Sequence, residues 1–248
     1  MIVIKSSSEI EYMRQAGKIV ARTLEKIQEV IKPGITTEFI NSFAEEYILK
    51  QNALPAFKGL YGFPATLCIS VNEEVVHGIP GNRILQEGQI VSIDCGAMIN
   101  GFYGDAARTY PVGKITAQAE TLIKVTKQSF FEGIKYAKIG NRIEDMSHAI
   151  QVYVEKNGFS VVRDYVGHGI GRAMHEDPQV PNYGRPGRGV RFAKGMCLAI
   201  EPMVNEGSYK VKTLSDGWTV VTVDGSMSAH YENTIVILDD SPEILTII

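Results

Sequence analysis

The sequence predicts an α+β fold made of two related halves, each with two helices followed by strands. Apolar residues recur at helical spacing in four segments, and short apolar runs of strand length follow each pair of them. A set of residues in the first half also recurs in the second at a nearly constant offset. No Ser/Gly-rich linker separates the halves, so we expect them to share one sheet.

The first half opens with a well-marked helix. Ser8 and Glu11 form a candidate capping box, and apolar residues then recur at helical spacing as far as Val30. The Lys-Pro-Gly sequence at 32–34 ends this helix. A second helix is expected at 37–50, and strands at 66–71, 89–98 and 101–111.

The second half repeats this order. Helices are expected at 117–137 and 142–157, with Gly158 as the stop of the latter. Strands are expected near 160–166, 196–204, 218–223 and 230–238.

The repeated residues hold register over some sixty positions of the first half. At an offset of 106, Lys32, Gly34 and Glu38 match Lys138, Gly140 and Glu144. At an offset of 107, Gly88, Val91, Ile93 and Asp94 match Gly195, Leu198, Ile200 and Glu201. Two copies indicate a duplication rather than a solenoid. We therefore expect one catalytic domain over 1–248, with pseudo-repeats at about 8–112 and 113–240.

Composition and charge exclude several classes of protein. Of the 248 residues, 44% are hydrophobic, which is typical of a globular chain. A net charge of -3 gives no overall attraction to DNA or an anionic membrane. No apolar run approaches the roughly 20 residues of a membrane span, and no signal peptide pattern opens the chain. We expect a cytoplasmic protein whose three separated cysteines are core residues.

Four acidic residues occupy positions where a strand should be apolar. Asp94 lies inside the apolar run 90–95, and Glu201 stands at the equivalent place of the second half. Asp105 and Glu232 lie on the strands that follow. Buried charges are costly unless they are paired or bound to metal, so such acids indicate a site.

A pseudo-two-fold axis between the halves would bring these four acids together. Four carboxylates cannot all ionise in one apolar pocket without cations, and two divalent ions would supply the charge. His168, between two glycines, would add a fifth ligand. Oxygen ligands with one imidazole suit Co, Mn, Fe or Zn. A common alternative stays open at this point, in which each Asp is a turn or cap residue and His168 a packed loop residue.

Several motifs resemble type I methionine aminopeptidases of the bacterial type (peptidase family M24, subfamily A). The motifs are Val75-Val76-His77-Gly78-Ile79-Pro80, the Asp94 and Asp105 pair, Gly167-His168-Gly169-Ile170-Gly171-Arg172, His175-Glu176-Asp177-Pro178, Ala199-Ile200-Glu201-Pro202 and Glu232-Asn233-Thr234. The resemblance covers nearly the whole chain in one order. It implies the pita-bread (creatinase/aminopeptidase) fold, with duplicated halves around a curved, mostly antiparallel sheet.

Two further features favour type I. Nothing before the first repeat could form a zinc-finger extension, and the segment from His168 to Glu201 is short for the helical insertion of type II enzymes. The resemblance implies removal of the initiator methionine from nascent proteins that have a small second residue. Two metals would bridge a hydroxide that attacks the first peptide bond.

The resemblance also assigns roles to single residues. Asp94 would chelate one metal, His168 and Glu201 the other, and Asp105 and Glu232 both. Glu201 would also shuttle the proton. Two histidines would contact substrate: His175 the carbonyl, as a stabiliser of the oxyanion, and His77 the amide nitrogen.

Matching positions imply an apolar methionine pocket. Its residues would be Phe57, Leu60, Phe63, Met174 and Trp218. Relatives often carry Cys, Tyr, Tyr and Phe at the first four, and the substitutions here remain apolar. Cys68 would lie nearby. Asn72 and Ser228 match positions that bind a monovalent cation in relatives.

The remaining signals are weaker. His148 is expected to be structural and His230 to support its strand. The basic loop 185–191 is expected to be a solvated loop, with transient contact to ribosomal RNA as the alternative. Only Lys210 and Lys212 stand in the hairpin used for ribosome docking by relatives, so strong docking is not expected. A monomer is the default.

Two other functions remain as alternatives. Proline-specific peptidases such as aminopeptidase P or prolidase use the same fold, but they usually carry a large extra N-terminal domain, whereas this chain begins almost directly with the first repeat. The other alternative is a non-catalytic binding protein that kept the fold. The presence of all five ligand types and both substrate histidines argues against it.

Overall fold

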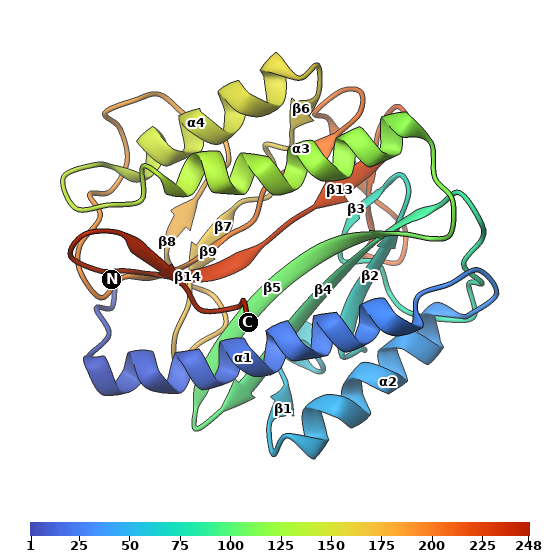
Figure 1. The fold of residues 1–248 in the computed structure, drawn as a ribbon, viewed down its shortest axis with the longest axis horizontal. Helices are drawn as coiled ribbons and strands as arrows, with labels where there is room; N and C mark the ends of the chain where they lie inside the picture. Colours follow the sequence, from blue (N-terminus) through green and yellow to red (C-terminus); the bar gives the residue numbers. More distant parts are fainter.

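The computed structural model describes all 248 residues. Four long helices are present: α1 (Ser7–Val30), α2 (Thr37–Lys50), α3 (Ala117–Ile134) and α4 (Ile143–Lys156). Figure 1 shows α1 and α2 at the bottom and α3 and α4 at the top, with the strands between and behind them. The expected order, two helices followed by strands in each half of the chain, is confirmed. No helix is both long and apolar enough to cross a membrane.

The first helix begins earlier than its expected cap. Ser6, not Ser8, is the N-cap, and the capping box joins it to Glu9. Three consecutive serines offer the same side chain, so the sequence alone could not choose among them. The backbone N–H of Lys5 donates to the carbonyl of Gly195 at 2.9 Å, which fixes where the extended chain turns into the helix. The second helix begins and ends where the sequence predicted.

The strands of the first half form a regular antiparallel sheet in the order β1-β4-β2, with β5 on the other side of β4. Their bounds are β1 Leu54–Pro55, β2 Leu67–Val71, β4 Ile90–Ile99 and β5 Phe102–Pro111; the short 3-10 turn η1 spans Leu60–Gly62 and β3 Glu74–Val76. Fully buried aliphatic side chains of α1, α2, β2 and β4 pack between helices and sheet, among them Ile27, Ile40, Leu67 and Ile93.

The strands of the second half are shorter. They are β6 Ser160–Val161, β7 Gly167–Gly169, β8 Glu176–Val180, β9 Cys197–Ile200, β10 Met203–Asn205, β11 Val211–Thr213, β12 Val220–Thr222, β13 Ser228–His230, β14 Asn233–Ile237 and β15 Pro242–Ile244. The expected strand 196–204 is therefore broken at Glu201 and Pro202, because proline has no N–H for a ladder. The expected strand 230–238 is likewise broken at Tyr231 and Glu232.

The two halves were expected to share a sheet, and they do so in the small sheet β11-β12-β3 rather than in one sheet throughout. The strands form four antiparallel sheets, three of them in the orders β13-β10-β6, β11-β12-β3 and β15-β14-β9-β7-β8. Several backbone contacts join the halves, among them the following two. Strand β12 pairs with β3, and Ala107 of β5 exchanges two backbone hydrogen bonds with Glu232, at 3.4 and 3.0 Å. The second link joins the first half to a residue that the sequence marks as a ligand.

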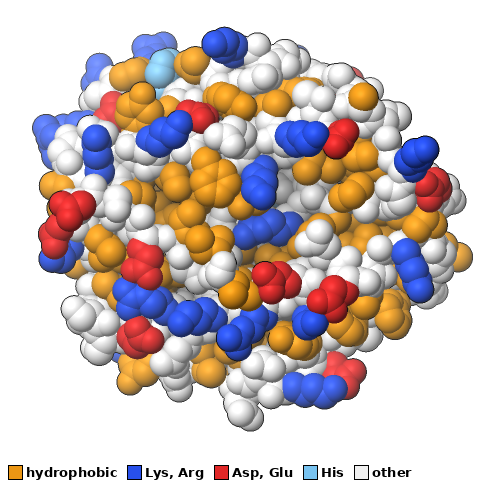
Figure 2. All heavy atoms as spheres, viewed as in Figure 1, with side chains coloured by type: hydrophobic (Ala, Val, Ile, Leu, Met, Phe, Trp, Pro, Cys, Tyr) orange, Lys and Arg blue, Asp and Glu red, His pale blue; other side chains and the backbone are white.

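The surface on the side of α1 and α3 carries side chains of both charges. Figure 2 shows Lys and Arg side chains interspersed with Asp and Glu over the face that carries α1 and α3. This agrees with the small net charge of -3.

Candidate active site

The two aspartates of the first half lie on neighbouring strands and share a face of the sheet. In the register of β4 and β5, Gly96 is opposite Asp105, and Asp94 stands two residues before Gly96. Residues directly opposite and residues two apart point to the same side, so the two carboxylates are diagonal neighbours. The hairpin spacing predicted this pairing correctly.

The two glutamates of the second half lie at breaks in strands. Glu201 follows β9 directly, and Glu232 directly precedes β14. The next residue of β14, Asn233, is opposite Ile200, so the glutamates emerge side by side from the end of this ladder. His168 of β7 pairs with Ala199 on the other side of β9.

All five expected ligands line one pocket of about 270 Å³. Nε2 of His168 lies 3.7 Å from Oδ2 of Asp105 and 3.7 Å from Oε1 of Glu201. One ligand atom each from Asp105, His168 and Glu232 lie within 4.8 Å of one another. Nδ1 of His168 lies 2.8 Å from the carbonyl of Gly169 and can only donate to it, so Nε2 keeps its lone pair toward the acids.

The electrostatics of this cluster call for cations. Burial raises the pKa of Asp94 to about 7. Burial and the neighbouring acids raise the pKa of Asp105, Glu201 and Glu232 well above the usual range. Buried oxygens of Asp94, Asp105 and Glu232 have no hydrogen-bond donor. Carboxylates without donors, beside an imidazole lone pair, form a donor set that fits divalent metal ions.

Both expected substrate histidines line the same pocket as neutral side chains. Burial lowers the pKa of His77 to about 4 and also lowers the pKa of His175. The ring of His175 lies 4.4 Å from that of His168 between centroids. His77 has a φ of 58°, a left-handed conformation that a non-glycine residue adopts at a cost. Such strain is found mostly at functional sites.

His230 lies closer to the acids than the sequence indicated. Its Nε2 is 4.0 Å from a carboxylate oxygen of Glu201 and 4.0 Å from one of Glu232. This nitrogen is buried without a partner, and burial lowers the pKa of His230 to about 3. A histidine two residues before a ligand predicts little by itself, since its direction depends on the strand break. His148 lies on α4 beside the carbonyl of Gly184, in keeping with a structural role.

Four of the five expected methionine-pocket residues line the apolar end of this pocket: Phe57, Leu60, Phe63 and Trp218. Phe63 and Trp218 meet edge to face at 5.1 Å. The turn between β11 and β12 brings Trp218 there, where the backbone N–H of Trp218 donates to Asp216. Cys68 also lines the pocket, and burial raises the pKa of its thiol, which therefore stays neutral.

Met174 departs from its expected place. Its side chain is only 2% exposed and does not line the pocket. It packs in the same apolar cluster as the pocket residues Phe57 and Phe63. A Cβ on residue 96 would lie only 2.8 Å from the Cε of Met174, so the absence of a side chain at Gly96 makes room for the methionine. This packing depends on a contact between distant parts of the chain, which residue-by-residue matching does not reveal.

Tyr61 lines the pocket although no sequence signal marked it. It is 75% exposed, has a φ of 52°, and its ring stacks on His175 at 5.7 Å. Glycines at 59 and 62, both with positive φ, form the tight turn that carries it. These glycines could have predicted a turn, but not the direction of the ring.

Asn72 and Ser228 lie together across the two halves. The backbone N–H of Ser228 donates to the carbonyl of Asn72 at 2.8 Å. The side-chain oxygen of Asn72 accepts from the N–H of Ile90 at 3.0 Å. The two residues thus join β13 to the turn after β2, as ordinary turn residues would.

Comparison with known proteins identifies the relatives of this chain. The profile of metallopeptidase family M24 matches residues 11–239. A methionine aminopeptidase of Clostridium acetobutylicum is 62% identical over 248 residues, which cover 100% of this chain and 99% of that protein. The crystal structure of a methionine aminopeptidase from Thermotoga maritima superposes with a TM-score of 0.98 at 52% identity, and the match covers 100% of both chains.

The proline-specific peptidases are more distant. A prolidase from Pyrococcus furiosus superposes with a TM-score of 0.81 at 21% identity, and the match covers 98% of this chain but 65% of that chain. This likeness shows the shared pita-bread fold. The Clostridium and Thermotoga relatives, which match at high identity over their full length, are both methionine aminopeptidases.

Proposed function

Because the chain belongs to metallopeptidase family M24, and within it to the methionine aminopeptidases, we propose that the pocket at the junction of its halves hydrolyses the first peptide bond of proteins that begin with methionine. The observation that carries the proposal is the convergence of five side chains that can bind metal: Asp94, Asp105, His168, Glu201 and Glu232.

Two divalent ions suit this ligand set. Asp94 is the proposed ligand of one ion, His168 and Glu201 of the other, and Asp105 and Glu232 of both. When bound, the ions supply hydroxide near neutral pH and polarise the scissile carbonyl. Four buried carboxylates need more positive charge than one divalent ion carries, which supports two ions. Co, Mn, Fe and Zn all remain compatible with these ligands.

The two neutral histidines are the proposed substrate contacts. Because the pKa values of His77 and His175 are lowered, both imidazoles can donate a hydrogen bond at neutral pH without adding charge to the pocket. His175 is the proposed donor to the scissile carbonyl, where negative charge develops. His77 is the proposed contact of the amide nitrogen. Glu201 is the proposed carrier of the proton to the leaving amine.

The apolar end of the pocket suits a methionine side chain. Phe57, Leu60, Phe63 and Trp218 surround it with aromatic and aliphatic surface. A thioether makes favourable contacts with aromatic rings, of about 0.3–1.5 kcal/mol each. Met174 supports this wall from behind. Tyr61 and His175 stack on each other at the same pocket, and we infer that they limit the second residue to a small one.

Further parts of the proposal concern the setting of the reaction. We propose that residues 1–248 act as one catalytic domain, a monomer working in the cytoplasm on nascent chains. Equivalent pairs of helices, α1 with α2 and α3 with α4, support pseudo-repeats at about 8–112 and 113–240. Contact with the ribosome would be transient, through the 185–191 loop or Lys210 and Lys212. Asn72 and Ser228 are the proposed site of a monovalent cation.

One assay tests the central proposal. The protein is stripped of metal with a chelator and then given Met-Ala-Ser, with Co, Mn, Fe or Zn added back singly. We expect no turnover without metal and recovery with at least one ion. An Xaa-Pro peptide serves as the competing substrate. Preference for Xaa-Pro, or full activity of the metal-free protein, would overturn the proposal.

A further inference from the structure

The loop between β7 and β8 carries His175, and it has little ladder pairing of its own. Residues 171–175 lie between the two strands, outside any helix or strand. Gly171 joins it to β5, where its carbonyl accepts from the N–H of Tyr103 at 2.9 Å. The imidazole of His175 rests on the rings of His168 and Tyr61. The position of this imidazole therefore depends on whatever holds the loop.

The carboxylate of Glu176 closes the loop from its far end. Its Oε1 accepts from the backbone N–H groups of Arg172 and Ala173, at 2.8 and 3.1 Å. Its Oε2 accepts from Nζ of Lys5 at 2.6 Å. One carboxylate thus joins three points: both ends of the turn that carries His175, and the N-terminal segment.

Lys5 is an unusual partner because it is buried. Its side chain is 2% exposed and that of Glu176 is 11% exposed. Buried ammonium groups are rare unless paired, and Glu176 is the only acid within salt-bridge distance of Lys5. Nζ also donates to the carbonyl of Val3 at 3.1 Å. A Cβ on Gly171 would stand 2.4 Å from Cε of Lys5, so the lysine stem packs tightly on the loop backbone.

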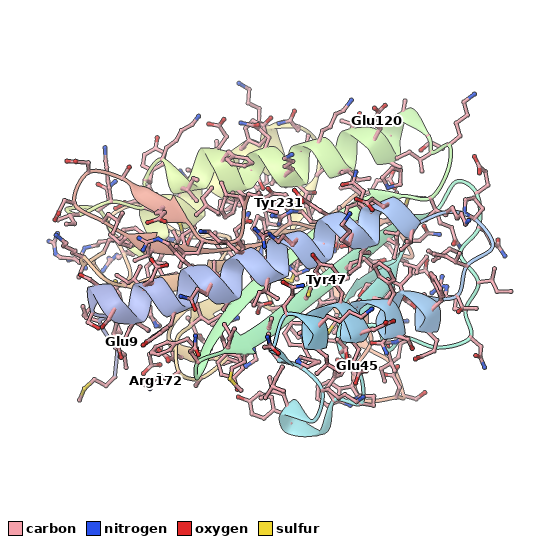
Figure 3. The ribbon with its side chains drawn as sticks, turned by 60° about the horizontal axis from the view of Figure 1, so that its bottom comes forward. Glu9, Glu45, Tyr47, Glu120, Arg172 and Tyr231 are labelled. Carbon is pink, nitrogen blue, oxygen red and sulfur yellow. The ribbon has the colours of Figure 1, made fainter.

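A second contact joins the loop to the first turn of α1. The guanidinium of Arg172 lies 3.2 Å from a carboxylate oxygen of Glu9 and stacks over the ring of Phe102 at 4.5 Å. Figure 3 shows Glu9 and Arg172 side by side at the N-terminal end of α1. The N-terminal segment, residues 1–6, and the first turn of α1 therefore both contact the loop.

We propose that Lys5 is a positioning residue for His175, acting through Glu176. The inference rests on the proposed function, in which His175 contacts the substrate. Lys5 holds the carboxylate of Glu176, the carboxylate holds the turn, and the turn sets the reach of the imidazole into the pocket. Met174, in the same loop, is held separately by packing against Phe57 and Gly96. Loss of Lys5 therefore moves the histidine more than the methionine wall.

The test is a pair of substitutions measured in two backgrounds. We expect Lys5→Met to lower kcat on Met-Ala-Ser by about 10- to 100-fold with little change in KM, since small misplacements of catalytic groups have effects of this size. Lys5→Arg, which keeps the charge, should recover most of the loss. In the His175→Ala background, Lys5→Met should change kcat less than about 2-fold, since nothing remains to be positioned. Lys194→Met, at an exposed lysine paired with Asp239, is the matched control.

A second measurement does not depend on turnover. In metal-free protein labelled at histidine, Lys5→Met should shift or broaden the imidazole resonance of His175 and leave that of His148 unchanged. Glu176→Gln serves as the alternative variant if Lys5→Met fails to fold. Equal losses of kcat in both backgrounds, or unchanged kcat and resonance in a folded variant, would overturn the inference. An unaffected kcat in His175→Ala alone would instead overturn the proposed role of His175, and the inference with it.

Discussion

The two halves of the molecule present their carboxylates in different ways. In the first half, Asp94 and Asp105 lie inside strands of ten residues each, with unbroken pairing from Ile90 to Ile99. In the second half, Glu201 and Glu232 lie at breaks, and the strands on either side belong to different sheets. The acids of the first half are thus held by a ladder, whereas those of the second half lie where the ladder ends.

Hydrogen bonds from other side chains hold the backbone carbonyls of these two glutamates. The side-chain amide of Asn182 donates to the carbonyl of Glu201 at 3.0 Å. The guanidinium of Arg108 donates to the carbonyl of Glu232 at 2.5 Å, and it stacks over the ring of Tyr231 at 4.4 Å. Figure 3 shows Tyr231 between α1 and α3. Both halves thus present acidic ligands at related positions, but the first half holds them by strand pairing and the second by hydrogen bonds from side chains.

The largest effect is expected from the proposed bridging acids, one from each half. Asp105→Asn and Glu232→Gln keep the shape of the side chain but remove its charge. Each should lower kcat/KM by about 10³-fold or more, since loss of a ligand should cost more than the 10- to 100-fold typical of its outer partners. Kinetics on Met-Ala-Ser together with metal content measure this. Glu120→Gln, on the exposed face of α3, should change nothing. Retention of metal and activity by either variant would break the equivalence of the two halves.

The next effect concerns pH and the metal-free protein. Burial raises the pKa of Asp94 to about 7, against about 3.9 in an unfolded chain. The native state therefore binds more protons than the unfolded state between these values, and stability falls as pH rises from about 4 to 7. The amide of Asp94→Asn cannot ionise. The free energy of unfolding of this variant, relative to that of the wild type, should therefore increase by about 2 to 4 kcal/mol from pH 4 to pH 8.

Denaturant unfolding in the presence of a chelator measures this difference. The lowered pKa values of His77 and His168 change the stability of the protein in the opposite direction. Because the unfolded state binds more protons at these imidazoles, their contribution to stability is lost as pH falls below about 6.5. Both proteins share that contribution, so it cancels in the difference. A pH-independent difference would show that Asp94 is not held as an unpaired buried carboxylate.

This asymmetry also explains how much could be predicted from sequence. Helix 37–50 was predicted from the apolar residues on one of its faces, and the side chain of Thr36 caps its first turn locally. The positions of Asp94 and Glu201 stood out because an acid inside an apolar run conflicts with its surroundings wherever the strand lies. The order of helices and strands, and the meeting of the four acids, therefore followed from local patterns and the repeat.

Features that depend on contacts between distant segments were not predicted. Apolar periodicity did not show the strand breaks of the second half. Pro202 could have marked the break after Glu201, whereas the break at Glu232 depends on which sheet each piece joins. The orientation of Tyr61 and the burial of Met174 depend on how two loops meet. His230 faces the acids only because β13 ends at the break. The proposed ligands were thus more predictable than the residues that support them.

A smaller effect is expected from Arg108, which supports a ligand of the second half. Arg108→Met keeps a stem against Tyr231 but removes the donors to the carbonyl of Glu232 and to the side chain of Asn233. Metal affinity should fall by about 10- to 100-fold, the range typical of groups that orient a ligand. Titration calorimetry measures it. Arg163→Met is the matched control, because Arg163 stacks on Tyr209 at 4.2 Å and supports no ligand. Unchanged affinity in Arg108→Met would mean that the break needs no such support.

The smallest effect is expected from Asn182, which makes a single bond to the other ligand of the second half. Asn182→Ala leaves the carbonyl of Glu201 without this donor, and one such bond contributes about 0.5–1.5 kcal/mol. We expect destabilisation of this size and a loss of metal affinity of only a few-fold. Asn157→Ala removes a similar bond, to the carbonyl of Tyr153 at the end of α4, and should cost stability without affecting metal. If both variants bind metal like wild type, Glu201 is held by its own ladder after all, and the contrast between the halves rests on Glu232 alone.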